Sequence, residues 1–133
     1  MILSVKTRET TEMVEMTSDI NSLVHKSGID QGLCMLFVPH TTAAITINES
    51  ADPSVKSDIQ MILNQIIPWE AGYRHYEGNS AAHIKATLVG SSELIAIENN
   101  KLVLGTWQGI FFCEFDGPRS RKLNVKLMEE RFA

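Results

Sequence analysis

Three of the four histidines lie at positions from which an imidazole can take part in chemistry. His40 follows the apolar run that ends at Val38, while His75 and His83 lie in or beside a polar segment without a helical period. Neutral imidazoles suit zinc or a similar divalent ion when a carboxylate completes the ligand set, and the candidate carboxylates are Glu49, Asp52 and Glu77. No pair has the spacing of a local metal motif. A metal site therefore requires distant segments to meet in space; otherwise these histidines serve the structure alone.

Two short turns, Gly78-Asn79-Ser80 and Gly90-Ser91-Ser92, offer backbone N–H groups that can surround phosphate oxygens. Arginine can neutralise a phosphate through a bidentate pair of hydrogen bonds, and the available cations are Arg74, Lys85, Arg119 and Arg121. Neither turn matches a P-loop. The sequence therefore leaves two interpretations open, an anion site or two plain turns.

Two further segments place polar side chains among apolar ones. Glu114 lies within the run IFFCEF, and a buried carboxylate needs a cation, a metal or a proton. We expect its partner to be Arg119 or a metal-bound histidine, in either a structural or a functional role. Trp107 and Gln108 lie between two glycines, which let the backbone approach another group closely. A tryptophan at this position equally suits the core or an interface.

Length and charge narrow the class of protein. A chain of 133 residues with 44% hydrophobic and 21% charged residues is typical of one globular domain, here residues 1–133. The net charge of −4 gives no long-range attraction to nucleic acid or to an anionic membrane. No apolar run reaches the roughly 18 residues of a membrane span and no signal peptide is apparent, so we expect a cytoplasmic protein. Cys34 and Cys113 lie in apolar runs, which favours buried reduced thiols over a bridge or redox pair.

The N-terminal third predicts a strand followed by a helix. Residues 2–9 are rich in Val and Thr and favour a strand, which we expect to pair with residues 13–16. Residues 17–19 supply oxygens for a helix N-cap, and Gly28 suits the C-terminal end of that helix. The helix is expected to be short, about two turns.

The middle of the chain predicts two strands and a long helix. Residues 32–38 form an apolar run too short for a helix, which favours a strand covered on both faces. Residues 43–48 alternate as a half-buried strand does. Asp52-Pro53 is a favourable helix start, and an apolar stripe continues from there to Ile67.

The C-terminal half predicts strands after a long loop. Residues 69–82 have no period, and residues 83–89 suit a short helix or a strand. Asn99-Asn100 indicates a two-residue hairpin turn, and strands are expected at 110–115 and 123–127. The whole pattern predicts an α+β fold with a mixed, largely antiparallel sheet folded on itself and about two helices.

Three blocks of the chain contain most of these polar residues: HTTAAITINESADPSV, YRHYEGNSAAHIKATLVGSS and LVLGTWQGIFFCEFDGPR. In this order and at this spacing they resemble the YjbQ-like family, described as secondary thiamine-phosphate synthases. The resemblance extends from about Leu33 to the C-terminus. A glycine is usual in the family about five residues before GTWQ, where this chain has Asn100, which also accepts a left-handed turn. The resemblance implies a compact α+β fold that commonly assembles as a trimer, with a polar cleft at subunit contacts.

The activity implied by the resemblance is a weak transferase reaction, which joins hydroxymethylpyrimidine diphosphate to a thiazole phosphate and releases diphosphate. The implied partner is a small phosphorylated metabolite, and the implied cofactor is a divalent metal ion, zinc or magnesium, with no organic cofactor. On this hypothesis the catalytic residues are His40, Glu49, Asp52, His83 and Glu114, and the metal ligands are His40, His75 and His83. The ligand-binding residues are Thr41, Thr42, Asn48, Gly78, Asn79, Ser91, Trp107, Gln108 and Arg119.

Two other functions fit the same residues. A non-catalytic oligomeric protein that binds a metal or a phosphorylated metabolite would bind its ligand without turnover. A purely structural role would use the histidines for packing between subunits. Metal content, product formation and the mass of the assembly distinguish these alternatives.

Overall fold

The computed structural model describes residues 1–132. Within that range the chain forms eight strands and three helices, so the predicted α+β class is confirmed, with one helix more than the sequence indicated. In chain order the elements are β1 (Ile2–Lys6), β2 (Glu12–Glu15), α1 (Thr17–Ser27), β3 (Gly32–Phe37), β4 (Ala43–Glu49), α2 (Pro53–Ile66), α3 (Ser80–Val89), β5 (Ser92–Glu98), β6 (Lys101–Leu102), β7 (Gln108–Glu114) and β8 (Ser120–Glu129).

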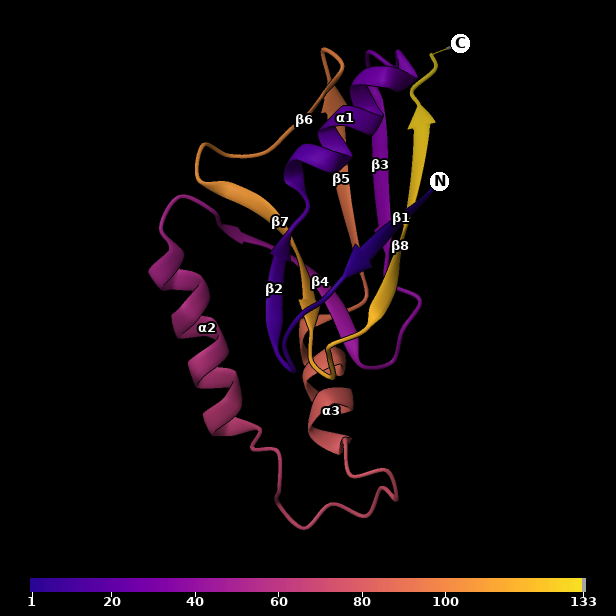
Figure 1. The fold of residues 1–133 in the computed structure, drawn as a ribbon. Coiled ribbons are helices and arrows are strands. Elements are labelled where there is room, and N and C mark those ends of the chain that lie inside the picture. Colours follow the sequence, from indigo (N-terminus) through magenta and orange to yellow (C-terminus); the bar gives the residue numbers. More distant parts are fainter. Residues whose placement is uncertain (133) are drawn as a thin grey trace.

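The strands form two sheets (Figure 1). The order is β1-β8-β3-β5-β6 in the larger sheet and β2-β7-β4 in the smaller one. Neighbouring strands in the described range run antiparallel. The predicted pairing of the first strand with residues 13–16 is wrong, because β1 pairs with β8 while β2 pairs with β7 in the other sheet. The residues between β1 and β2 therefore carry the chain from one sheet to the other.

The main core lies between the two sheets and under α1. Alternation along each strand turns every second side chain toward this space, which removes apolar surface from water at a gain of about 25 cal/mol per Å². Its buried members come from both sheets and from α1, and include Ile20, Val24, Leu36, Ile45, Ile110, Phe112, Leu123 and Val125. The core thus fixes the position of β4 and β7, which hold the predicted site residues Asn48, Glu49, Gln108 and Glu114.

Helix α1 ends where the sequence predicts but begins differently. Gly28 follows its last turn at φ +73°, a conformation that glycine adopts without strain. The predicted N-cap within residues 17–19 is wrong, because Met16 occupies the cap and no side chain hydrogen-bonds there. The hydroxyl of Thr17 instead accepts the N–H of Ile110 at 2.8 Å. That contact joins α1 to β7, and only the tertiary structure provides it.

The outer face of the larger sheet is not covered by a described helix (Figure 1). Leu33 and Phe37 alternate outward along β3 and are exposed, so the prediction of a strand covered on both faces is wrong. The neighbouring strands add Leu94 and Met128, which are also exposed. We call Leu33, Phe37, Leu94 and Met128 the outer apolar face. The reason for the exposure is that α1 packs on the inner side of the sheet, against the main core.

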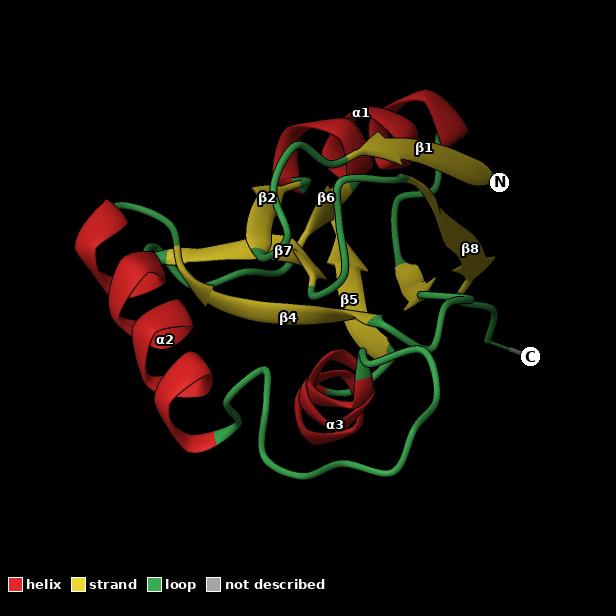
Figure 2. Cartoon of the chain, turned by 60° about the horizontal axis from the view of Figure 1, so that its bottom comes forward, coloured by secondary structure: helices red, strands yellow, loops and turns green. Residues whose placement is uncertain are grey.

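Helices α2 and α3 lie on the far side of the smaller sheet (Figure 2). A second apolar cluster there joins Phe111 and Cys113 of β7 to Ala82 and Ala86 of α3. The contact with α2 is looser, and no residue of α2 is buried despite its predicted apolar stripe. No helix in the described part of the chain combines the length and apolar character needed to cross a membrane.

The start of α2 is as the sequence predicts, whereas the start of α3 is not. As predicted, the carboxylate of Asp52 caps α2 and accepts the N–H of Ser54 at 2.9 Å. Helix α3 begins at Ser80, inside the segment predicted as a loop, and the undecided residues 83–89 are helical. The apolar residues of α3 pack on the smaller sheet but do not form one clear stripe along the helix. Hydrophobic periodicity therefore did not predict this helix.

The predicted hairpin turn and the predicted state of the cysteines are confirmed. Asn99 and Asn100 join β5 to β6 at φ +53° and +61°. The Asn100 side chain also donates to the carbonyls of Val24, at 3.0 Å, and Ile29, at 2.6 Å, so it ties the hairpin to the end of α1. Both cysteines are free and buried. Burial raises the pKa of the Cys34 thiol to about 11 and that of the Cys113 thiol to about 12.

Candidate functional site

Strand β4 separates the predicted site residues into two groups. Residues 40–42 precede its first residue, whereas residues 48–49 form its end. Seven residues of strand span about 20 Å at roughly 3.3 Å per residue. The antiparallel partner β7 places Glu114 opposite the start of β4 and Gln108 opposite its end. The two groups therefore lie at opposite ends of the strand, although Asn48 and Glu114 both line one cavity of about 140 Å³.

The group at the start of β4 surrounds an open depression. Two cavities of about 370 and 320 Å³ share His40, Thr41 and His83 in their walls, and we call them together the histidine cleft. Each volume falls in the range of a small-molecule site. The remaining residues of its walls are Pro39, Thr42, Ala43, Glu77, Asn79, Ala86, Thr87, Gly90, Ser91, Arg119 and Arg121.

The three predicted metal ligands lie around this cleft without forming a metal centre. The rings of His75 and His83 meet edge to face with centroids 5.2 Å apart, and both line a further cavity of about 410 Å³. His75 lies 3.9 Å from the carboxylate of Glu77. Among residues 1–132, however, no group of three His, Cys, Asp or Glu side chains is placed to hold a metal ion. The residues of one chain thus do not fit a metal as they stand, and metal binding stays a prediction.

His40 has a structural contact that fixes its protonation. Its Nε2 accepts the backbone N–H of Lys122 at 2.9 Å, so the neutral ring carries its proton on Nδ1. Lys122 belongs to β8 and lies beyond the last pair of β3 and β8, which is Phe37 with Asn124. The imidazole of His40 therefore accepts the N–H that a longer β3 would have bonded. Burial, followed by the charge of Arg121, lowers the pKa of His40. His40 is therefore a neutral hydrogen-bond donor at the wall of the cleft.

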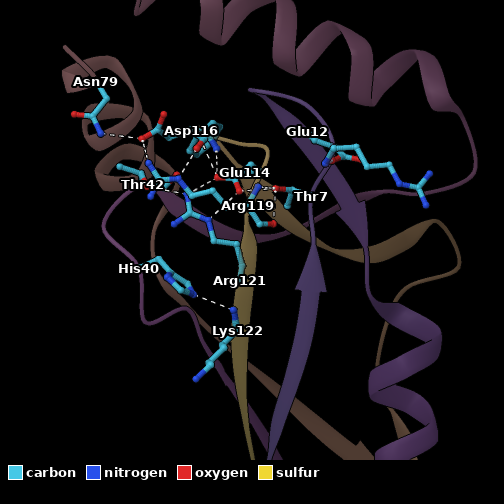
Figure 3. A network of polar contacts seen from close by, with 12 residues as sticks. Thr7, Glu12, His40, Thr42, Asn79, Glu114, Asp116, Arg119, Arg121 and Lys122 are labelled. Atoms are coloured by element: carbon cyan, nitrogen blue, oxygen red, sulfur yellow. Dashed lines mark hydrogen bonds and ion pairs between the residues drawn. The ribbon is translucent and has the colours of Figure 1, made fainter. Parts of the chain in front are cut away.

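Glu114 is fully buried and satisfied by the protein itself (Figure 3). Its carboxylate accepts from Arg121 through Nε at 2.8 Å and through Nη2, and from the Thr7 hydroxyl at 2.7 Å. The N–H groups of Phe115 and Asp116 complete the set. Burial by itself raises the pKa of this carboxyl, but the hydrogen bonds from Arg121, Thr7 and Asp116 and the charge of Arg121 outweigh it, so the pKa is lowered.

The expected partner of Glu114, Arg119 or a metal-bound histidine, is therefore wrong. The partner is Arg121, which lies two residues after Arg119, within β8, and whose side chain points inward. There it also donates to the Thr42 hydroxyl at 2.8 Å. Arg119 precedes β8 and turns to Asp116, with Nε 2.8 Å from its carbonyl and Nη2 2.8 Å from its carboxylate. Arg121 lies on the inward face of β8, whereas Arg119 lies before the strand begins, and this difference decides which arginine is buried with the carboxylate.

Asp116 was missed by the sequence reasoning, and Arg121 was named there only as one of four cations. Asp116 connects two predicted site residues, because its Oδ2 accepts from both Arg119 and Asn79 at 2.8 Å. The i, i+3 spacing of Asp116 and Arg119 was the available signal. No comparable signal in the sequence predicts that Arg121 is buried, because its position depends on the register of β8 against β1.

The second group, at the end of β4, makes local contacts. Asn48 accepts the N–H of Glu49 at 2.7 Å, and Glu49 accepts the N–H of Ala51 at 2.9 Å. Asp52 caps α2, which lowers its pKa through the hydroxyl and N–H of Ser54. These carboxylates shape the turn into α2 and lie away from the histidine cleft.

Trp107 and Gln108 belong to the same end. Gln108 accepts the N–H of Gly105 at 2.8 Å, and the Trp107 carbonyl accepts the N–H of Ser50 at 2.8 Å. The Trp107 side chain is 64% exposed. It is therefore not part of the core of the chain, and an interface or a ligand remains as the reason for a tryptophan there.

The two predicted phosphate turns differ in what they contribute. Gly78 is a turn glycine at φ +76° whose N–H bonds to the carbonyl of His75, while Ser91 lines the histidine cleft. Lys85 is not available for an anion, because it is buried and donates to Asn64 of α2. Burial lowers its pKa.

Comparison with known proteins agrees with the fold and with these blocks. The family model described as "UPF0047 protein YjbQ-like" matches residues 1–130. The chain belongs to the YjbQ-like UPF0047 family. The UPF0047 protein YugU of Bacillus subtilis is 48% identical over 95% of this chain and 96% of its own length. A UPF0047 protein of Methanocaldococcus jannaschii is 51% identical over 96% and 92%, respectively.

Solved structures of the YjbQ-like family have the same fold. A protein of Clostridium acetobutylicum, described as an uncharacterized conserved protein of the family, is 52% identical and superimposes with a TM-score of 0.94 over 96% of this chain and 99% of that one. A Sulfolobus solfataricus protein is 36% identical, with a TM-score of 0.93 over 97% and 95%. It is described as of unknown function.

These relatives correct one expectation from the sequence. The YjbQ-like proteins of high identity carry a family name without an activity, and one solved member is described as of unknown function. Nothing in these comparisons points to thiamine-phosphate synthesis. The expected joining of hydroxymethylpyrimidine diphosphate to thiazole phosphate is therefore wrong as an assignment, although the family itself is correct.

Proposed function

We propose that the histidine cleft binds the phosphate group of a small phosphorylated metabolite. The observation that carries the proposal is a pair of arginines in its wall, each with one outer nitrogen left over. Arg119 and Arg121 use Nε and Nη2 on protein acceptors, whereas Nη1 of each makes no hydrogen bond within residues 1–132. Guanidinium groups with free donors are suited to phosphate oxygens.

Both arginines are held in place before a ligand arrives. Asp116 fixes the guanidinium of Arg119 in two places, and Glu114 does the same for Arg121. Binding an anion then costs little side-chain ordering. The carboxylates also balance the two charges, which is consistent with a site that depends on directed donors more than on net charge.

Two further features of the cleft favour an anion. Asn79, the N-cap of helix α3, lies in its wall, and the N–H groups of Ser80 and Ala81 have no acceptor in the described part of the chain. A helix N-terminus with free N–H groups attracts anions. His40 adds a neutral N–H donor. Glu77 is the opposing charge in the wall, and its side chain is mostly exposed to solvent beside His75.

Phosphate binding can be tested by titrating the protein with inorganic phosphate and with 2-hydroxyethyl phosphate, followed by ³¹P NMR or calorimetry. Arg119→Met should weaken binding about tenfold or more, since a hydrogen bond to a charged group is worth about 1.5–3 kcal/mol. Arg8→Met removes the same charge outside the cleft walls and should change affinity less than twofold. Repeating the titration with zinc, magnesium or EDTA tests the metal prediction. The absence of binding at millimolar concentrations would refute the proposal.

We also propose that the chain assembles as a homotrimer. Exposed apolar side chains on one surface indicate a partner, and the outer apolar face includes Leu94, which is 61% exposed. Helix α2, without a buried residue, adds a second incompletely covered surface. The apolar surfaces favour contact between copies, while the number three is taken from the family resemblance. A cytoplasmic location is part of the same proposal and is supported by the two free, buried cysteines.

Analytical ultracentrifugation tests the assembly. The wild-type chain should sediment with three times the mass of one chain, and Leu94→Lys should shift it toward the monomer. Glu9→Lys, at an exposed position away from the outer apolar face, is the matched control and should keep the trimer. A wild-type protein that remains monomeric at micromolar concentration would contradict the proposal.

A further inference from the structure

Asn79 carries a buried oxygen without a partner. The residue is 7% exposed, and its Nδ2 donates to Oδ2 of Asp116 at 2.8 Å (Figure 3). Its Oδ1 is buried and receives no hydrogen bond within residues 1–132. The amide cannot be reversed, because the carboxylate of Asp116 accepts hydrogen bonds and would then face another acceptor. Buried polar atoms of this kind are rare and call for a donor.

The side chain of Asn79 does not cap α3, although its position is that of the N-cap. Asn79 is the N-cap of α3, where an amide oxygen usually accepts an N–H of the first turn. Its side chain makes no such bond, and the N–H groups of Ala82 and His83 bond to its backbone carbonyl instead. The amide oxygen is thus left for something other than the helix.

The location of Asn79 indicates what that donor is. Asn79 lines the histidine cleft together with Arg119, and one oxygen of Asp116 holds both side chains at 2.8 Å. A phosphate bound to Arg119 would therefore have the Asn79 amide as a near neighbour. The oxygen of that amide repels phosphate oxygens but accepts from a hydroxyl or an amino group.

Resting on the proposed phosphate binding, we propose that the ligand of the histidine cleft is a phosphate monoester with a hydroxyl or amino group close to its phosphate. Asn79 Oδ1 accepts the hydrogen bond of that group, while Arg119 and Arg121 bind the phosphate. A site built to accept from a ligand hydroxyl discriminates against the analogue that lacks it, because the buried acceptor is then left unpaired.

The test compares two esters of similar shape, 2-hydroxyethyl phosphate and 2-methoxyethyl phosphate. The methoxy ester keeps the oxygen and lacks the donor. Wild-type protein should bind the hydroxy ester about tenfold more tightly. Asn79→Ala should reduce this preference to less than about twofold, and Ser57→Ala, on α2 outside the cleft walls at a hydroxyl that donates to the Pro53 carbonyl, should retain it.

Each outcome has a separate meaning. Equal affinity of the wild-type protein for the two esters would overturn this inference while leaving phosphate binding intact. A preference that survives in Asn79→Ala would also overturn it, because another residue would then be the acceptor. Failure of both esters and of inorganic phosphate to bind would refute the proposed function, and this inference with it. The comparison within wild-type protein does not depend on whether the variant folds.

Discussion

Replacing Arg121 by methionine should destabilise the protein by about 3–5 kcal/mol. Methionine replaces the aliphatic part of the arginine side chain but provides neither the charge nor the donors, and the carboxylate of Glu114 stays fully buried. Glu114 would keep the hydroxyl of Thr7 and two backbone N–H groups, and lose both bonds from the guanidinium. Removing one partner of a buried ion pair leaves an uncompensated charge, and costs of this size follow from that.

Urea unfolding followed by circular dichroism measures the effect. The set comprises wild type, Arg121→Met, Glu114→Gln and the double variant, and the double variant should cost at least about 1.5 kcal/mol less than the sum of the two single changes. Thr42→Val is the control for the periphery of the network. It removes only the hydroxyl that Arg121 also contacts, and should cost about 1 kcal/mol.

The pH dependence of stability provides an independent check. The pKa of Glu114 is lowered from the ordinary value of 4.5, so its contribution is complete above that pH and is lost as the pH falls through the folded-state pKa. Glu114→Gln should lack this part of the acid sensitivity. An Arg121→Met cost below about 1 kcal/mol, or additive effects of the two substitutions, would show that the buried pair does not hold these strands together.

Three smaller changes test other contacts. The pKa of His40 is lowered from 6.5, so as the pH falls below that value the unfolded chain binds a proton before the folded protein does, and the stability of the folded protein decreases. His40→Gln can still accept the N–H of Lys122, and its melting temperature should depend less on pH between about 7 and 5. Asn100→Gly keeps the turn but loses two donated bonds, and should cost about 1–3 kcal/mol in urea, whereas Asn99→Gly should cost almost nothing. Asp52→Ala removes the cap of α2 and should lower the melting temperature.

The sequence by itself determined the features that depend on neighbouring residues. The Asp52 cap, the end of α1 at Gly28 and the Asn99-Asn100 turn are as predicted. Each reflects backbone conformations or hydrogen bonds within a few positions, so local chemistry was sufficient. The α+β class followed from the same local patterns, and the polar blocks were sufficient for the family.

Only the tertiary structure decided which distant residues meet. It divided the predicted site between the two ends of β4, paired Glu114 with Arg121 rather than Arg119, and gave α3 its helical form against the smaller sheet. The Thr7–Glu114 hydrogen bond joins residues 107 positions apart. Such contacts depend on strand register and on the packing of whole sheets, which no short segment of the sequence specifies.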